Sequence, residues 1–123
     1  MYLKDLKLTF DLNKGKTISL NRNFYMDVYR DYNTTVSIYD KTIVDSEKVV
    51  AQISYNVDAQ TVSLFLRSDG TLTSTNKMEY HMTDKVDNLN LSPELIKELK
   101  KYYRWRNLWK IKNKINQVLK KDK

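Results

Sequence analysis

The spacing of the apolar residues changes once along this chain of 123 residues, and that change limits the folds open to it. Up to about residue 82, apolar residues recur at every second position, which is the period of a β-strand with one buried face. Beyond about residue 92 they recur at helical spacing. This order predicts an α+β fold in which an antiparallel sheet is followed by a helical segment.

The sheet is predicted to be a meander of about six or seven strands, because short turn signals separate the alternating segments. The first strand is expected where Leu6, Leu8, Phe10 and Leu12 alternate with polar residues, followed by a turn in which Gly15 takes positive φ. The strongest turn signal is the run 68–71. One apolar face per strand predicts one covered face and one solvated face, with the C-terminal helix as the cover. Further strands are expected in residues 18–28, with a bend at 21–23, and in residues 36–38, 49–57 and 62–66. A last strand is expected to follow the turn at 68–71 and to end near Met82.

The helical segment is predicted to begin at Ser92, which can cap the helix, with Pro93 in the first helical position. Its apolar residues then form two stripes on nearly opposite sides, and one straight helix cannot lay both on one sheet. Either the segment kinks around residues 104–107 into two short helices, or the second stripe contacts a partner such as a second copy of the chain. The first stripe is Leu95, Leu99, Tyr102 and Trp109, and the second is Leu108, Ile111, Ile115, Val118 and Leu119.

The charge follows the same division of the chain. We expect one domain over residues 1–123, with the sheet in 1–90 and the basic helical segment in 91–123. Residues 1–90 carry 11 Lys/Arg and 12 Asp/Glu, whereas residues 91–123 carry 11 Lys/Arg and 3 Asp/Glu. The first part thus contributes −1 and the basic segment +8 to the net charge of +7. A neutral body with a cationic segment indicates a negatively charged partner.

Cations and aromatic residues interleave in residues 100–110, a combination that nucleic-acid-binding proteins use. Lysine and arginine neutralise phosphates, while tryptophan and tyrosine stack on unpaired bases. Trp105 lies off both apolar stripes and is therefore the aromatic residue expected to contact a partner. A solvated basic face behind aromatic core anchors would produce the same residue types. The predicted nucleic-acid-binding residues are Lys97, Lys100, Lys101, Arg104, Trp105, Arg106, Lys110, Lys112 and Lys114.

The sequence offers few residues for catalysis or for metal binding. There is no cysteine, and His81 is the sole histidine, so neither a thiol nucleophile nor a common zinc site is expected. Both glycines fall at turns, which leaves no phosphate-binding glycine loop. The carboxylates fall in turns or on polar strand faces. We therefore expect no enzyme and no cofactor or metal. The lack of cysteine, of a signal peptide and of a membrane-spanning apolar run predicts a cytoplasmic protein.

Two functions from different classes fit these features. The first is an accessory protein that binds DNA or RNA through phosphate contacts. The second is an inhibitor or adaptor that binds a host nucleic-acid enzyme or a defence nuclease, in an anti-CRISPR-like or anti-restriction-like role. Alanine, glycine and proline are scarce and lysine, asparagine, tyrosine and isoleucine are common, which is typical of AT-rich coding and indicates a phage or mobile element. A Lys-rich helix on an anionic lipid surface is a third alternative.

Overall fold

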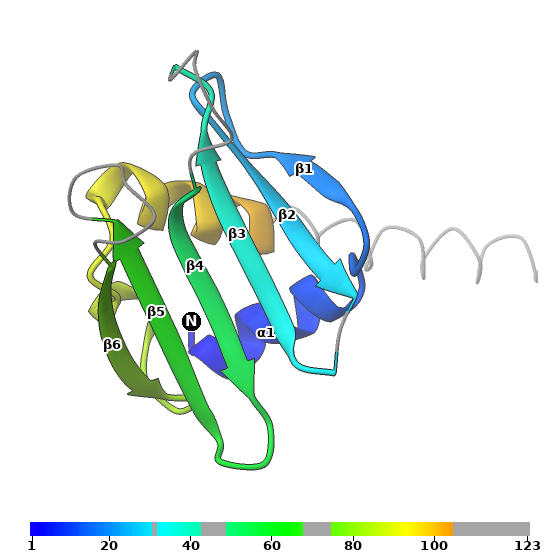
Figure 1. Cartoon of the computed structure of the whole chain (residues 1–123), viewed down its shortest axis with the longest axis vertical. Coiled ribbons are helices and arrows are strands. Elements are labelled where there is room, and N and C mark those ends of the chain that lie inside the picture. Colours follow the sequence, from blue (N-terminus) through cyan, green and yellow to red (C-terminus); the bar gives the residue numbers. More distant parts are fainter. Residues whose placement is uncertain (31, 43–48, 68–74, 105–123) are drawn as a thin grey trace, which may run out of the picture.

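The computed structural model of the chain describes residues 1–30, 32–42, 49–67 and 75–104. Within these ranges six strands form one sheet in chain order, and every neighbouring pair is antiparallel (Figure 1). The predicted meander is therefore confirmed. The strands are β1 (Thr17–Ser19), β2 (Phe24–Arg30), β3 (Thr34–Asp40), β4 (Val49–Asn56), β5 (Thr61–Arg67) and β6 (Thr75–His81).

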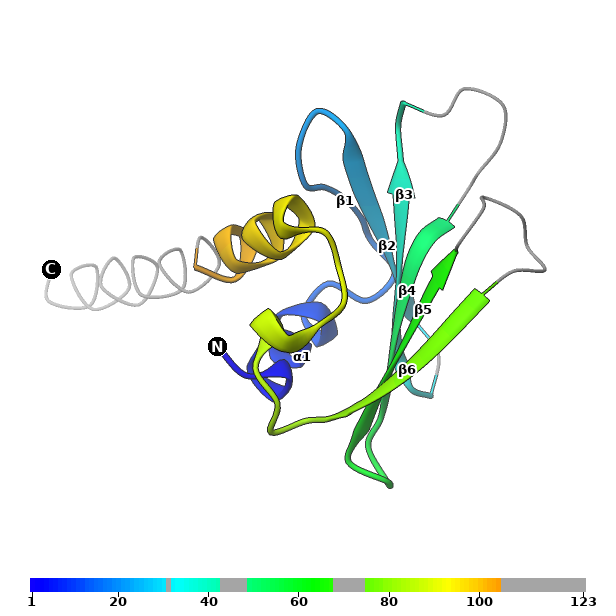
Figure 2. The ribbon, with the colours of Figure 1, turned by 90° about the vertical axis from the view of Figure 1, so that its left-hand side faces the viewer.

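The helices of the described ranges lie together on one face of this sheet (Figure 2). They are α1 (Leu3–Asp11), the short 3₁₀ helix η1 (Val86–Asn88) and α2, described over residues 93–104. Figure 2 views the sheet from its edge and shows α1 and α2 on the same side, with no described helix on the other. The prediction that helices cover one face of the sheet is confirmed, but the cover predicted to be the C-terminal helix consists of α1 as well as α2 (Figure 2). None of the helices in the described ranges is long and apolar enough to cross a membrane.

The first predicted strand is wrong, because its residues form α1. Leu3, Leu6 and Phe10 are completely buried, and their spacing of three and four residues places them on one face of a helix. Leu8 and Leu12, which strand alternation places beside Leu6 and Phe10, are 62% and 50% exposed. Residues four apart share a face in a helix as well as in a strand, so Leu6 and Phe10 satisfied both patterns. Packing against the sheet selected the helix.

A buried tyrosine joins α1 to the centre of the sheet. The hydroxyl of Tyr55, in β4, donates a hydrogen bond of 3.0 Å to the carbonyl oxygen of Leu3. Its ring also meets that of Phe10 edge to face, with 6.1 Å between the ring centres. Burial raises the pKa of Tyr55 above its ordinary value. The core therefore continues from the inner face of the sheet into α1.

The positive φ predicted for Gly15 is confirmed, whereas the bend expected within residues 18–28 reverses the chain and separates β1 from the antiparallel β2. Gly15 takes a φ of 83°, and its N–H donates to the carbonyl oxygen of Val28 at 2.7 Å. In the bend before β2, the side-chain oxygen of Asn21 accepts from the N–H groups of Asn23 at 2.7 Å and Phe24 at 2.9 Å. The turn predicted at residues 68–71 lies outside the described residues.

A carboxylate at the end of α1 joins the helix layer to β3. Asp11 accepts hydrogen bonds from the ammonium of Lys7 at 2.5 Å and from the hydroxyl of Thr34, and Lys14 lies 3.6 Å away. Burial acts to raise the pKa of Asp11, but the hydrogen bonds from Lys7 and Thr34 outweigh it, so the pKa lies below its ordinary value. The ionised form therefore stabilises the folded state.

The Asp11→Asn variant is expected to lower the free energy of unfolding by about 1 kcal/mol at pH 7. Because folding lowers the pKa of Asp11, its contribution is present above the unfolded-state pKa and disappears as the pH falls through the folded-state pKa. Urea unfolding at pH 7 and at about pH 2 should show the difference from the unmodified chain shrinking in acid. The Asp58→Asn variant changes an exposed carboxylate in the β4–β5 turn and serves as the control. A difference that persists at acid pH would contradict this role.

Candidate nucleic-acid interface

The start of α2 follows the predicted cap. The hydroxyl of Ser92 accepts a hydrogen bond of 3.3 Å from the N–H of Leu95, and its carbonyl oxygen accepts one of 3.1 Å from the N–H of Ile96. Pro93 occupies the first helical position. Leu95 and Leu99 are buried against the sheet, while Ile96, Tyr102 and Tyr103 are half-buried beside them. This packing fixes which side of α2 faces solvent.

Three of the predicted phosphate contacts share that solvent side. Lys97, Lys101 and Arg104 follow one another at spacings of four and three residues, which places them on one helical face, opposite Leu95 and Leu99. All three are exposed. Within the described part of the chain, none of them forms an ion pair. We call these three residues the cationic stripe.

Lys100 lies off the cationic stripe and is bound to the body of the protein. Its ammonium forms an ion pair and hydrogen bond with the carboxylate of Asp87 in η1. The hydrogen bond from Lys100 holds the pKa of Asp87 below its ordinary value. Of the four predicted cations that the structure describes, Lys100 is therefore the one whose charge is offset by a carboxylate of the fold.

The other predicted contacts lie outside the described residues. They comprise the remaining nucleic-acid-binding residues Trp105, Arg106, Lys110, Lys112 and Lys114, and the dimer or partner contacts Leu108, Ile111, Ile115, Val118 and Leu119. The predicted kink at residues 104–107 falls at the same boundary. These expectations stay predictions.

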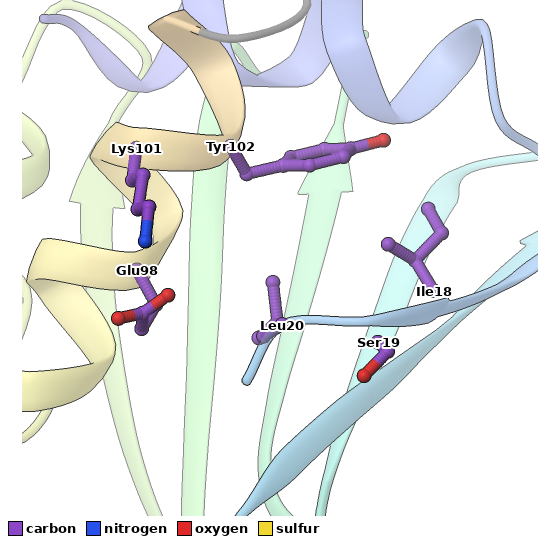
Figure 3. Close-up of a pocket in the computed structure, with 6 residues that line it drawn as sticks. All are labelled: Ile18, Ser19, Leu20, Glu98, Lys101 and Tyr102. Atoms are coloured by element: carbon purple, nitrogen blue, oxygen red, sulfur yellow. The ribbon is translucent and has the colours of Figure 1, made fainter. Parts of the chain in front are cut away.

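A pocket of about 270 Å³ opens between α2 and the edge strand β1, and sequence reasoning missed it. Figure 3 shows Ile18, Ser19 and Leu20 on the strand side, facing Glu98, Lys101 and Tyr102 on the helix. Alternation had placed Ile18 and Leu20 on the covered face of the sheet. Their position beside α2 depends on contacts between distant parts of the chain, such as the hydrogen bond of 3.4 Å from the side-chain amide of Asn21 to the carboxylate of Glu94.

The solvated face of the sheet carries a tyrosine cluster that was also not predicted. Tyr25 and Tyr39 are cross-strand neighbours whose rings stack with 4.7 Å between their centres. The hydroxyls of Tyr29 and Tyr39 are hydrogen-bonded at 3.3 Å. This bond and burial raise the pKa of Tyr39. The signal was the alternation of Tyr25 and Tyr29 with the buried Met26 and Val28, which puts the two tyrosines on the opposite face of β2. The cluster faces away from α2 and is separate from the cationic stripe.

The described residues provide no cluster of acidic or histidine side chains that could hold a metal ion. His81 is exposed at the end of β6, and its backbone N–H donates to the carboxylate of Asp84 at 2.8 Å. That carboxylate therefore has a structural partner in the turn after β6.

No protein-family model matches this chain, and neither the curated proteins nor the solved structures contain a significant match to it.

Proposed function

We propose that this chain is an accessory protein that binds DNA or RNA by contacting phosphates through the solvent side of α2. The observation that carries the proposal is the cationic stripe. Lys97, Lys101 and Arg104 are exposed on one helical face, and no carboxylate of the described residues is paired with them. The buried Leu95 and Leu99 on the opposite face hold the helix in place, so the cations are presented on a fixed scaffold.

The length of the stripe suits a phosphate backbone. A helix rises about 1.5 Å per residue, so Lys97 and Arg104 are separated by roughly 10 Å along the axis. Duplex DNA carries one charge per about 1.7 Å of its axis, which leaves more than enough phosphates within reach of three cations. Phosphate contacts of this kind carry no sequence information by themselves. The proposal is therefore for binding that is largely independent of sequence.

The rest of the basic segment adds further positive charge to that of the stripe. Residues 105–123 contain 7 Lys/Arg and 1 Asp/Glu, and they follow α2 directly in the chain. A polyanion held at the stripe would experience the attraction of these charges as well. The residue usage typical of AT-rich coding supports a phage or mobile element as the setting.

Binding to a labelled oligonucleotide is expected to weaken steeply with salt. Three phosphate contacts predict a slope of about −2 in a plot of log K against log salt for a single strand, and a steeper one if residues 105–123 also contribute. Fluorescence anisotropy with the full chain, single-stranded and duplex oligonucleotides and a series of salt concentrations measures it. An oligomer of the same bases on an uncharged backbone is the control and should not bind. Absence of binding at low salt, or equal binding of the uncharged oligomer, would refute the proposal.

A further inference from the structure

We propose that the free edge of β1 binds an extended, acidic segment of a partner protein, which adds to the sheet as a further strand and places an apolar side chain in the pocket beside α2. This is a second binding function, which differs from the phosphate contacts in its ligand and shares Lys101 with the cationic stripe. It is carried by three features of the described residues: the backbone groups of β1, the pocket, and the charges around the strand.

At the edge of the sheet, β1 has backbone N–H and C=O groups that form no hydrogen bond with the described residues. The carbonyl oxygen of Lys16 accepts from the N–H of Val28 at 3.0 Å, and the N–H of Leu20 donates to the carbonyl oxygen of Phe24 at 3.0 Å. These residues thus face β2. Because the direction alternates along an antiparallel strand, the N–H and C=O groups of Thr17 and Ser19 point away from the sheet. No hydrogen bond joins them to another described residue.

The opposite edge of the sheet is protected, which makes the open edge of β1 distinctive. In β6, Lys77 and Glu79 form an ion pair at 3.2 Å, and charged side chains on an edge discourage pairing with another strand. The N–H of His81 is occupied by the carboxylate of Asp84. In β1 the side chains of Thr17 and Ser19 are small and uncharged. An added strand therefore meets no charged side chain on β1 itself.

The pocket lies where the side chains of an added strand would point. Successive side chains of a strand alternate between the two faces of a sheet, and the pocket is on the face that carries Ile18. Figure 3 shows the ring of Tyr102 across the pocket from Ile18 and Leu20. Strand addition uses backbone hydrogen bonds for affinity and such pockets for specificity. One apolar side chain of the partner segment would enter the pocket, between the strand and the helix.

The charges around β1 select an acidic segment. Lys16 directly precedes the strand, Arg22 follows it in the bend, and Lys101 lines the pocket; all three are exposed, and none forms an ion pair with another described residue. Glu98 is the carboxylate that lines the pocket.

Lys41 adds a fourth cation, because its ammonium donates to the Ser19 hydroxyl at 2.8 Å. Two further carboxylates also lie at the strand and its bend: Asp27 accepts from the Thr17 hydroxyl at 2.5 Å, and Glu94 accepts from the side-chain amide of Asn21 at 3.4 Å. Four cations against three carboxylates leave an excess of positive charge, which complements a segment that carries glutamate or aspartate beside its apolar residue.

The test is a fluorescence polarisation titration of the full chain with a labelled peptide of the sequence Glu-Thr-Glu-Val-Phe-Val-Glu-Thr-Glu. We expect saturable binding that is weakened about tenfold by the Ser19→Pro variant, because proline removes an edge N–H and obstructs the added strand. The fold should tolerate this change, since the N–H of Ser19 does not face β2. The Ser19→Ala variant is the matched control: it removes the hydroxyl that contacts Lys41 at 2.8 Å but keeps the N–H. It should bind the peptide more tightly than Ser19→Pro, because the edge N–H is retained.

A second arm keeps the test decisive if Ser19→Pro unfolds the protein. In an added strand, the N–H groups of every second peptide residue face β1, and those of the residues in between face away from it. N-methylation of the first set should abolish binding, whereas N-methylation of the second set should leave it unchanged. Equal effects of the two sets, or no saturable peptide binding, would overturn the inference. So would a tenfold loss of single-stranded oligonucleotide affinity in Ser19→Pro with peptide binding unchanged, because the edge would then serve a nucleic acid.

Discussion

Replacing Lys97, Lys101 and Arg104 together by glutamine is expected to flatten the salt dependence of nucleic-acid binding. Each phosphate contact on a single strand contributes about 0.7 to the slope of log K against log salt, so the three contacts account for about 2. The unmodified chain should therefore lose about 20-fold more affinity than the variant between 50 and 200 mM salt. Anisotropy titrations of both proteins with one oligonucleotide measure this difference.

A change in net charge alone could weaken binding of a polyanion, so the control must remove the same charge elsewhere. Lys4, Lys77 and Lys85 are exposed and lie off the cationic stripe. Their triple replacement by glutamine should leave the slope nearly unchanged. If both triple variants lose the same slope, the attraction is a property of the whole surface and α2 is not the interface. Circular dichroism and thermal unfolding confirm that each variant is folded.

Truncating Leu6 to alanine is expected to lower the free energy of unfolding by about 2–5 kcal/mol, which is the cost of a cavity in a well-packed core. Leu6 is completely buried on the inner side of α1. For a domain whose total stability is on the order of 5–15 kcal/mol, this loss is large. Urea unfolding followed by circular dichroism measures it.

The matched control is the same truncation two residues along the chain. Leu8 is 62% exposed, so Leu8→Ala should change the free energy of unfolding by only about 0.5 kcal/mol. In a strand, Leu6 and Leu8 would share a face and the two truncations would have similar effects. Similar losses in the two variants would thus argue against α1, and a large difference supports the helix.

The N-terminal segment shows why alternation alone was insufficient. A short run in which Leu6, Leu8, Phe10 and Leu12 alternate with polar residues satisfies the strand pattern, yet Leu3, Leu6 and Phe10 satisfy the helical one. The two patterns have Leu6 and Phe10 in common. What decides between them is whether Leu3 or Leu8 is buried, and that depends on the surface that the rest of the chain offers. Tyr55 takes part in that surface through its bond to the carbonyl of Leu3.

The candidate sites likewise combine features that spacing along the chain predicts with features that it does not. The stripe on α2 could be predicted in large part: helical spacing places Lys97, Lys100, Lys101 and Arg104 roughly on one side, and three of these four cations form the stripe. The pairing of Lys100 with Asp87 could not, since it joins α2 to a 3₁₀ helix that no pattern indicated. The same holds for the pocket beside β1, whose two sides lie about eighty residues apart in the chain.

The amino-acid sequence by itself determined the features that depend on near neighbours: the meander of strands, the turn at Gly15, the cap at Ser92 and the cationic stripe. These follow from backbone geometry and from periods of two and 3.6 residues. Only the tertiary structure decided that the first segment is a helix, that Lys100 is held by a carboxylate, and that β1 borders a pocket. Such features arise from burial and charge pairing between distant residues, and spacing along a chain carries no record of which distant surfaces will meet.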